Sequence, residues 1–126
     1  MSNLNALEYG VYYHIYNRGN NGENIFVEQH NYRYFLQLYA KYVEPVADTY
    51  AYCFLRNHFH LLVRIKTEEE IQRTFGVWCE TPKPLSPSQQ FSHWFNAYAK
   101  AINKSYGRTG SLFEHPFRRI PVTSDA

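Results

Sequence analysis

The chain has 126 residues, of which 44% are hydrophobic and 18% aromatic, and its formal net charge is +2. This length suits one domain, and a composition so rich in aromatic residues excludes a disordered or low-complexity segment. No apolar run is long enough to span a membrane, and the two cysteines are too few for a disulfide framework. The sequence therefore predicts one globular domain in a reducing, cytoplasmic compartment, with no membrane as a partner.

The first part of the chain predicts a strand, a turn and a helix. Aromatic and β-branched residues over 10–17 are typical of a strand, and the Asn- and Gly-rich residues 17–22 predict a turn. From Tyr32 the apolar residues recur with the spacing of one helical face, and Pro45 predicts the end of that helix.

A hairpin and a short helix come next. Residues 49–55 and 58–65 read as two strands around a tight turn at Arg56-Asn57, because Asn tolerates the left-handed conformation of such turns. Residues 67–70 (Thr-Glu-Glu-Glu) have the pattern of a capping box. They predict a short helix that ends by Gly76.

The last third predicts a loop, a long helix and a final strand. Residues 77–85 contain two prolines and predict the loop. Ser86 is typical of a helix N-cap, a proline follows at the first helical position, and Gly107 predicts the end of the helix. Residues 111–122 predict a fourth strand, at an edge or with a bulge because Pro116 has no N–H to donate.

Together the four strands and two main helices have the order strand, helix, strand, strand, helix, strand. This is the order of the ferredoxin-like βαββαβ fold. We therefore predict an α+β domain over residues 1–126, with an antiparallel sheet and helices packed on one of its faces. In such a sheet the first and third strands are neighbours.

The segment His58-Phe59-His60 is the clearest candidate site. Residues two apart in a strand point to the same face, so the two imidazoles lie side by side, opposite the apolar residues of their strand. Paired neutral imidazoles can bind a divalent metal, with a third ligand from elsewhere. Two surface histidines beside a turn are the alternative interpretation. His14 shares a face of the first strand with Tyr12 and Tyr16, and it is either a further ligand or a hydrogen-bonded packing residue.

Three blocks of sequence carry a more specific signal. They are residues 13–19 (Tyr-His-Ile-Tyr-Asn-Arg-Gly), 57–63 (Asn-His-Phe-His-Leu-Leu-Val) and 106–113 (Tyr-Gly-Arg-Thr-Gly-Ser-Leu-Phe). In this order they resemble the single-tyrosine HUH transposases, above all the insertion-sequence-200-like type and its REP-associated branch. The His-hydrophobic-His motif of that family is matched by His58-Phe59-His60. The resemblance implies that His58 and His60 are catalytic and bind Mg²⁺ or Mn²⁺.

The activity that this resemblance implies is DNA transposition. Such domains bind single-stranded or hairpin DNA, then cut and rejoin it through a metal-assisted 5′-phosphotyrosine intermediate. The resemblance further implies a bacterial, cytoplasmic protein that is associated with the nucleoid when bound to DNA, with a homodimer as the candidate assembly. Arg18, Arg108, Arg118 and Arg119 are the candidate contacts to the DNA backbone, because guanidinium groups suit phosphate oxygens.

One departure from the family concerns the nucleophile. In the family, the attacking tyrosine and a third, polar metal ligand lie on a helix after the fourth strand, which would begin about where this chain ends at Ala126. We therefore expect the nucleophilic tyrosine to be absent from this chain, as in a C-terminally truncated copy.

Three other functions are weighed against this one. The first is a catalytically inactive module that binds single-stranded DNA and derives from such a transposase. The second is a small metal- or histidine-dependent phosphoesterase, although the repeated motif of that class is not found. The third is an RNA-recognition-like module, which shares the βαββαβ order but carries aromatic residues where this chain has its histidine pair.

Overall fold

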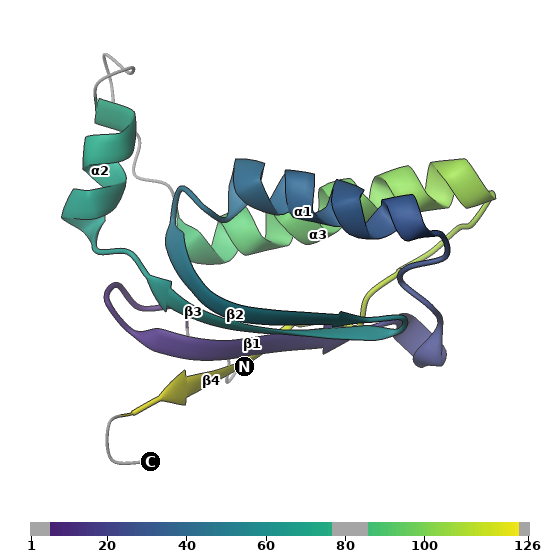
Figure 1. Ribbon diagram of the computed structural model, residues 1–126, viewed down its shortest axis with the longest axis horizontal. Helices are drawn as coiled ribbons and strands as arrows, with labels where there is room; N and C mark the ends of the chain where they lie inside the picture. The colour runs from purple at the N-terminus through teal and green to yellow at the C-terminus, as the bar shows by residue number, and fades with distance from the viewer. Residues whose placement is uncertain (1–5, 77–85, 124–126) are drawn as a thin grey trace.

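The helices and strands follow one another in the predicted order (Figure 1). A computed structural model describes residues 6–76 and 86–123, so the loop predicted over 77–85 lies outside the described residues. The strands are β1 (Tyr12–Arg18), β2 (Ala47–Leu55), β3 (His58–Ile65) and β4 (Arg118–Val122). The helices are α1 (Gln29–Tyr42), α2 (Glu68–Gly76) and α3 (Pro87–Tyr106), and a short 3₁₀ turn, η1, covers Asn20–Gly22.

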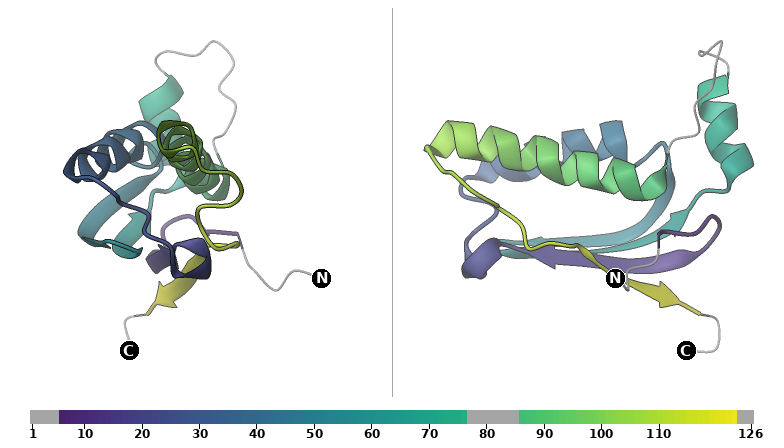
Figure 2. Two further views of the ribbon diagram at one scale, coloured as in Figure 1. Left: turned by 90° about the vertical axis from the view of Figure 1, so that its right-hand side faces the viewer. Right: turned by 180° about the vertical axis from the view of Figure 1, so that it is seen from behind.

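The four strands form one antiparallel sheet in the order β2-β3-β1-β4. As predicted, β1 lies beside β3. Helices α1 and α3 lie together on one face of the sheet, whereas no described helix covers the opposite face (Figure 2). The predicted α+β, ferredoxin-like class is thus confirmed. None of the described helices is both long and apolar enough to cross a membrane.

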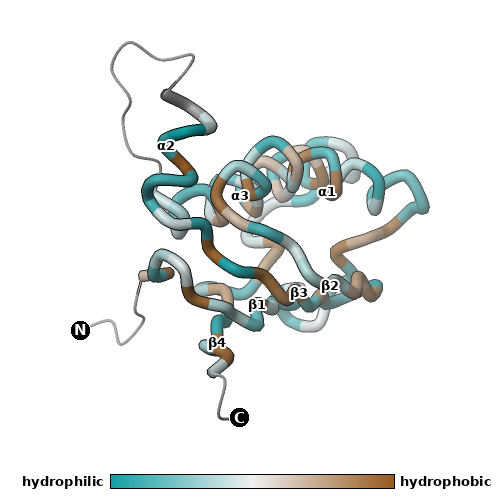
Figure 3. The backbone as a smooth tube through the Cα atoms, turned by 60° about the vertical axis from the view of Figure 1, so that its left-hand side comes forward, coloured by the Kyte–Doolittle hydropathy of each residue, from teal (hydrophilic) through white to brown (hydrophobic). Residues whose placement is uncertain are grey.

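The core lies between the sheet and the two long helices. Along β3 buried and half-buried residues alternate strictly, and Phe59, Leu61, Val63 and Ile65 form the buried face. Helices α1 and α3 show alternating hydrophobic and hydrophilic stretches (Figure 3), and their apolar sides supply most of the aromatic residues of the core. Because the core takes one side of β3, the residues between these four are left on the uncovered face.

Helix α1 begins three residues before the predicted Tyr32. Its first turn is closed by a capping box, in which the Asn31 side chain accepts hydrogen bonds from the backbone N–H groups of Glu28 (2.7 Å) and Val27 (2.9 Å). The two residues of the capping box, Glu28 and Asn31, are polar, so the apolar periodicity that predicted the helix does not include them.

The last strand is shorter than predicted, since β4 covers only 118–122 of the expected 111–122. Leu112, Phe113 and Phe117 turn into the core instead. In this segment the backbone forms isolated hydrogen bonds to β1 and η1 instead of a continuous ladder. One of them runs from Asn20 N–H to Leu112 O (2.8 Å). The apolar residues in the first part of the predicted strand are buried here by an irregular segment.

The predicted capping box of α2 is confirmed. Glu70 N–H donates to Thr67 Oγ1 (3.2 Å), and Thr67 N–H donates to Glu70 Oε1 (3.0 Å). Arg64 on β3 donates to the same carboxylate (2.9 Å), and together these bonds lower the pKa of Glu70 from 4.5 to about 2, with Arg64 the largest cause. Glu70 thus ties α2 to the uncovered face of the sheet.

This lowered pKa leads to a testable pH dependence. Because the folded-state pKa lies below the unfolded one, the contribution of Glu70 to the free energy of unfolding is complete above pH 4.5 and is lost as the pH falls toward 2. Glu70→Gln should therefore lower the urea midpoint at pH 7 and leave it unchanged near pH 2. Glu69→Gln, at the exposed neighbouring position, is the control and should change the midpoint little at either pH. A Glu70→Gln effect of the same size at both pH values would contradict this role.

Candidate functional site

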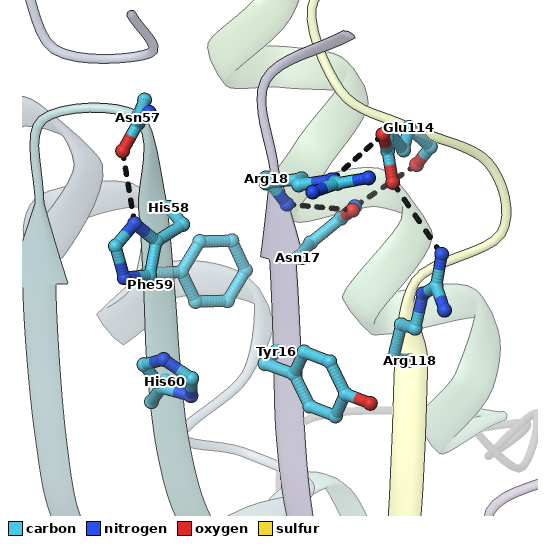
Figure 4. A pocket seen from close by; sticks show the side chains of 9 residues that line it. All are labelled: Tyr16, Asn17, Arg18, Asn57, His58, Phe59, His60, Glu114 and Arg118. Atoms are coloured by element: carbon cyan, nitrogen blue, oxygen red, sulfur yellow. Dashed lines mark hydrogen bonds and ion pairs between the residues drawn. The ribbon is translucent and has the colours of Figure 1, made fainter. Parts of the chain in front are cut away.

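An open cavity of about 440 Å³ lies at the end of the sheet where β1 ends and β3 begins (Figure 4). Its walls come from β1, the β2–β3 turn, the start of β3 and the segment that leads into β4. The titratable side chains that line it are those of Tyr16, Arg18, His58, His60, Glu114 and Arg118. Two of the three sequence blocks described above therefore meet here, and the third ends just before Glu114.

Close backbone packing brings these segments together. Gly19 N–H donates to Asn57 O (2.9 Å), and Glu114 N–H donates to Arg18 O (3.0 Å). Glycine is required at position 19, because a Cβ there would lie 1.9 Å from Glu23 O. Hence Gly19 holds the end of β1 beside the β2–β3 turn.

The histidine pair points to the uncovered face, as predicted. The imidazoles of His58 and His60 are both half-buried, and their ring centroids lie 5.3 Å apart with nearly perpendicular planes. His58 Nδ1 lies 2.9 Å from Asn57 Oδ1. Because a carbonyl oxygen only accepts, Nδ1 carries the proton, and in the neutral ring Nε2 is then the atom with a free lone pair.

His14 also belongs to this group. Its Nε2 lies 2.9 Å from His60 Nδ1, across the β1–β3 pairing. The Tyr16 ring stacks against both imidazoles, with centroid distances of 4.8 Å to His14 and 5.8 Å to His60. Burial lowers the pKa of the His60 imidazole, and the neighbouring His14 and His58 lower it further. The site thus favours the neutral form of the His60 imidazole.

The ring nitrogens of His58 and His60 are of the kind that binds divalent cations in proteins. Among the described residues no hydrogen bond uses Nε2 of His58 or of His60, so this is the nitrogen that each ring offers to a ligand when it carries no proton. No three His, Cys, Asp or Glu side chains within 6–76 and 86–123 are arranged to hold a metal ion. Within these described residues, the histidine pair is therefore not part of a complete three-ligand metal site.

Two of the four predicted arginines line the cavity. Arg18 Nε lies 2.8 Å from Glu114 Oε2, and Arg118 reaches the other oxygen of the same carboxylate at 3.5 Å. Both arginine side chains are more than half exposed, at 66% and 56%. Glu114 is a residue that the sequence analysis missed; no periodicity marks it, since its place depends on the long-range bond of its backbone N–H to Arg18 O.

The other two arginines lie elsewhere. Arg108 forms an ion pair with Glu23 and a hydrogen bond with Asn103, so it closes the C-terminal end of α3. Arg119 follows Arg118 but points to the opposite side of the strand, where its guanidinium lies 3.7 Å from the centroid of the Phe117 ring. The structure thus does not bring these two side chains into the cavity.

Among the tyrosines of the described residues, only Tyr16 lines the cavity. Its hydroxyl points toward β4 and away from the histidine pair (Figure 4). Tyr98 is fully buried in α3, where its hydroxyl donates to Ile25 O (2.6 Å) and burial raises its pKa. Tyr106 donates to Asn31 Oδ1 (3.4 Å) on the helical side of the sheet. Neither α3 tyrosine is therefore near the imidazoles.

Comparisons with known proteins place this geometry in context. No protein-family model and no curated protein matches the sequence. One similar solved structure is that of a REP-associated tyrosine transposase bound to a REP hairpin, with a TM-score of 0.58 and 9% identity. The match covers 98% of this chain and 62% of that one, so the chain spans less than two thirds of the relative's length.

A second similar structure is that of a candidate transposase from Deinococcus radiodurans R1. Its TM-score is 0.57 and its identity 14%, and the match covers 98% of this chain and 88% of the other. Identities this low establish the fold and leave the chemistry to the residues themselves. Over nearly its whole length, the chain has the fold of these transposase structures, as the resemblance implied.

Proposed function

We propose that this chain is a HUH-type transposase domain that binds single-stranded or hairpin DNA at the cavity beside β1 and β3. The observation that carries the proposal is the meeting of His58 and His60 with two exposed guanidinium groups, those of Arg18 and Arg118, in one cavity. A fold shared with a transposase bound to a DNA hairpin supports it. The bacterial, nucleoid-associated location and the homodimer stay predictions of the resemblance.

Each group in the cavity has a distinct task under this proposal. His58 Nε2 and His60 Nε2 would hold Mg²⁺ or Mn²⁺, which when bound draws charge from the oxygens of the scissile phosphate. Arg18 and Arg118 bind the flanking phosphates. To do so, each must give up its ion pair with Glu114. The Glu114 carboxylate keeps the two side chains extended and close together before DNA arrives.

DNA binding should depend on the two arginines of the cavity. We expect Arg18→Gln with Arg118→Gln to weaken binding of a labelled hairpin-flanked single strand about 100-fold, because a hydrogen bond to a charged group contributes roughly 1.5–3 kcal/mol. The slope of log affinity against log salt should also fall by about 1.4, at roughly 0.7 per lost phosphate contact. Fluorescence anisotropy over a salt series measures both quantities.

The matched control removes the same charge from the helical side. Lys100→Gln with Lys104→Gln changes two exposed residues of α3. This variant should bind with nearly the affinity of the unchanged protein. If both pairs of substitutions weakened binding equally, the interaction would follow net charge, and the cavity would not be the DNA site.

Cleavage is tested separately from binding. We expect residues 1–126 with Mn²⁺ and labelled single-stranded DNA to form no covalent adduct on a denaturing gel. In-line attack needs the nucleophile within about 3–3.5 Å of phosphorus, whereas the Tyr16 hydroxyl points away from the histidine pair (Figure 4). DNA binding without an adduct is also what the inactive DNA-binding module would give. An adduct that Tyr16→Phe removed would instead identify Tyr16 as the nucleophile.

A further inference from the structure

The contact between His14 and His60 decides which nitrogen of His60 is available. His14 Nε2 and His60 Nδ1 lie 2.9 Å apart, while the ring centroids are 5.1 Å apart and the planes differ by 22°. The two nitrogens thus lie between the ring centres, so the imidazoles meet edge to edge in a hydrogen bond. Nδ1 of His60 is occupied, and only Nε2 can turn to a ligand.

Two arrangements of the proton satisfy this hydrogen bond, and they differ in their consequence. If His14 donates, neutral His60 carries its own proton on Nε2 and presents an N–H to the cavity, where no cation can bind. If His60 donates from Nδ1, its Nε2 keeps a free lone pair. His58 already has this second form, because Asn57 Oδ1 accepts from its Nδ1.

We propose that His14 is a positioning residue that accepts the Nδ1 proton of His60 and so keeps His60 Nε2 free as a metal ligand. This inference rests on the proposed function of the pair. Asn57 and His14 would then do the same work for the two members of the pair, one from the turn and one from β1. Ligating histidines commonly have such a partner on the other ring nitrogen, which fixes tautomer and orientation.

Tyr16 supports the arrangement from one side. Its ring lies within 27° of parallel to both imidazoles and stacks against each of them. Turning the ring of His14 or of His60 out of its present plane would break this stacking as well as the hydrogen bond. The two rings are therefore held in the plane that the hydrogen bond needs.

The first experiment reads the tautomer of His60 without any metal. The ring ¹⁵N shifts of His60 at neutral pH should report a proton on Nδ1 and none on Nε2. In His14→Phe, which keeps an aromatic ring but has no acceptor, the ¹⁵N shifts should no longer report His60 in this one tautomer. His14→Gln, whose side-chain oxygen accepts, should restore it. Tyr12→Phe is the matched control, because Tyr12 lies on the same face of β1 and has its ring contact with Tyr50; it should change nothing.

The second experiment titrates the same four proteins with Mn²⁺. His14→Phe should bind about 10-fold more weakly or worse, the effect typical of a lost partner of a metal ligand, and His14→Gln should recover most of the affinity. A His60 that carries its proton on Nε2, or that keeps its tautomer in His14→Phe, would overturn the inference. If the unchanged protein bound no Mn²⁺, the proposed metal function would fail, while the ¹⁵N shifts would still decide the role of His14.

Discussion

Replacing His58 and His60 together with alanine should abolish binding of Mn²⁺. The two imidazoles lie side by side on the uncovered face with ring centroids 5.3 Å apart, and the Asn57 contact leaves His58 Nε2 free. With only two protein ligands, the unchanged protein should bind the ion weakly, since water fills most of the coordination sphere. Isothermal titration calorimetry, or the loss of the free Mn²⁺ signal in electron paramagnetic resonance, measures the difference.

A control variant tests whether Mn²⁺ binding depends on this histidine pair or only on the number of histidines in the chain. His30→Ala with His93→Ala removes two exposed imidazoles from α1 and α3, and should leave Mn²⁺ binding intact. The His58/His60 variant should also stay folded, because both side chains lie off the apolar face and changes at such positions cost little stability. Persistent Mn²⁺ binding, or unfolding of the double variant, would mean that the pair is structural.

The largest loss of stability should come from Trp94→Ala. Trp94 has no exposed surface, its ring stacks on Phe35 with centroids 4.2 Å apart, and its Nε1–H donates to Phe35 O (3.0 Å). Removing the ring leaves a cavity between α1, α3 and the sheet, and truncations of this kind cost about 3–5 kcal/mol. The free energy of unfolding of small domains is only about 5–15 kcal/mol, so chemical denaturation should show the loss clearly.

Trp94→Phe distinguishes packing from hydrogen bonding. Phenylalanine fills part of the space but leaves Phe35 O without its side-chain donor, and it should cost about 1–3 kcal/mol. A loss below about 1 kcal/mol for Trp94→Ala would mean that the neighbouring rings close over the cavity. That outcome would contradict a tightly packed aromatic centre.

Local patterns predicted much of the fold. Three predictions follow from interactions within a few residues, and each is confirmed. They are the second strand of the hairpin, over 58–65, the capping box at Thr67 and the N-cap at Ser86. Alternation along β3 placed the histidine pair opposite the core for the same reason. Where the prediction differed, at the start of α1 and over 111–117, polar caps or irregular burial replaced the pattern that periodicity detects.

The candidate site depends both on the local sequence and on the tertiary structure. The sequence by itself determined that His58 and His60 share a face, because side-chain direction in a strand repeats every two residues. Only the tertiary structure decided their surroundings: His14 meets His60 across 46 positions, and Arg18 meets Glu114 across 96. It also placed Arg108 outside the cavity, whereas the local alternation of a strand already puts Arg118 and Arg119 on opposite sides of β4. These contacts exist because β1 pairs with β3 on one side and β4 on the other, and no local pattern encodes which distant side chains that pairing brings together.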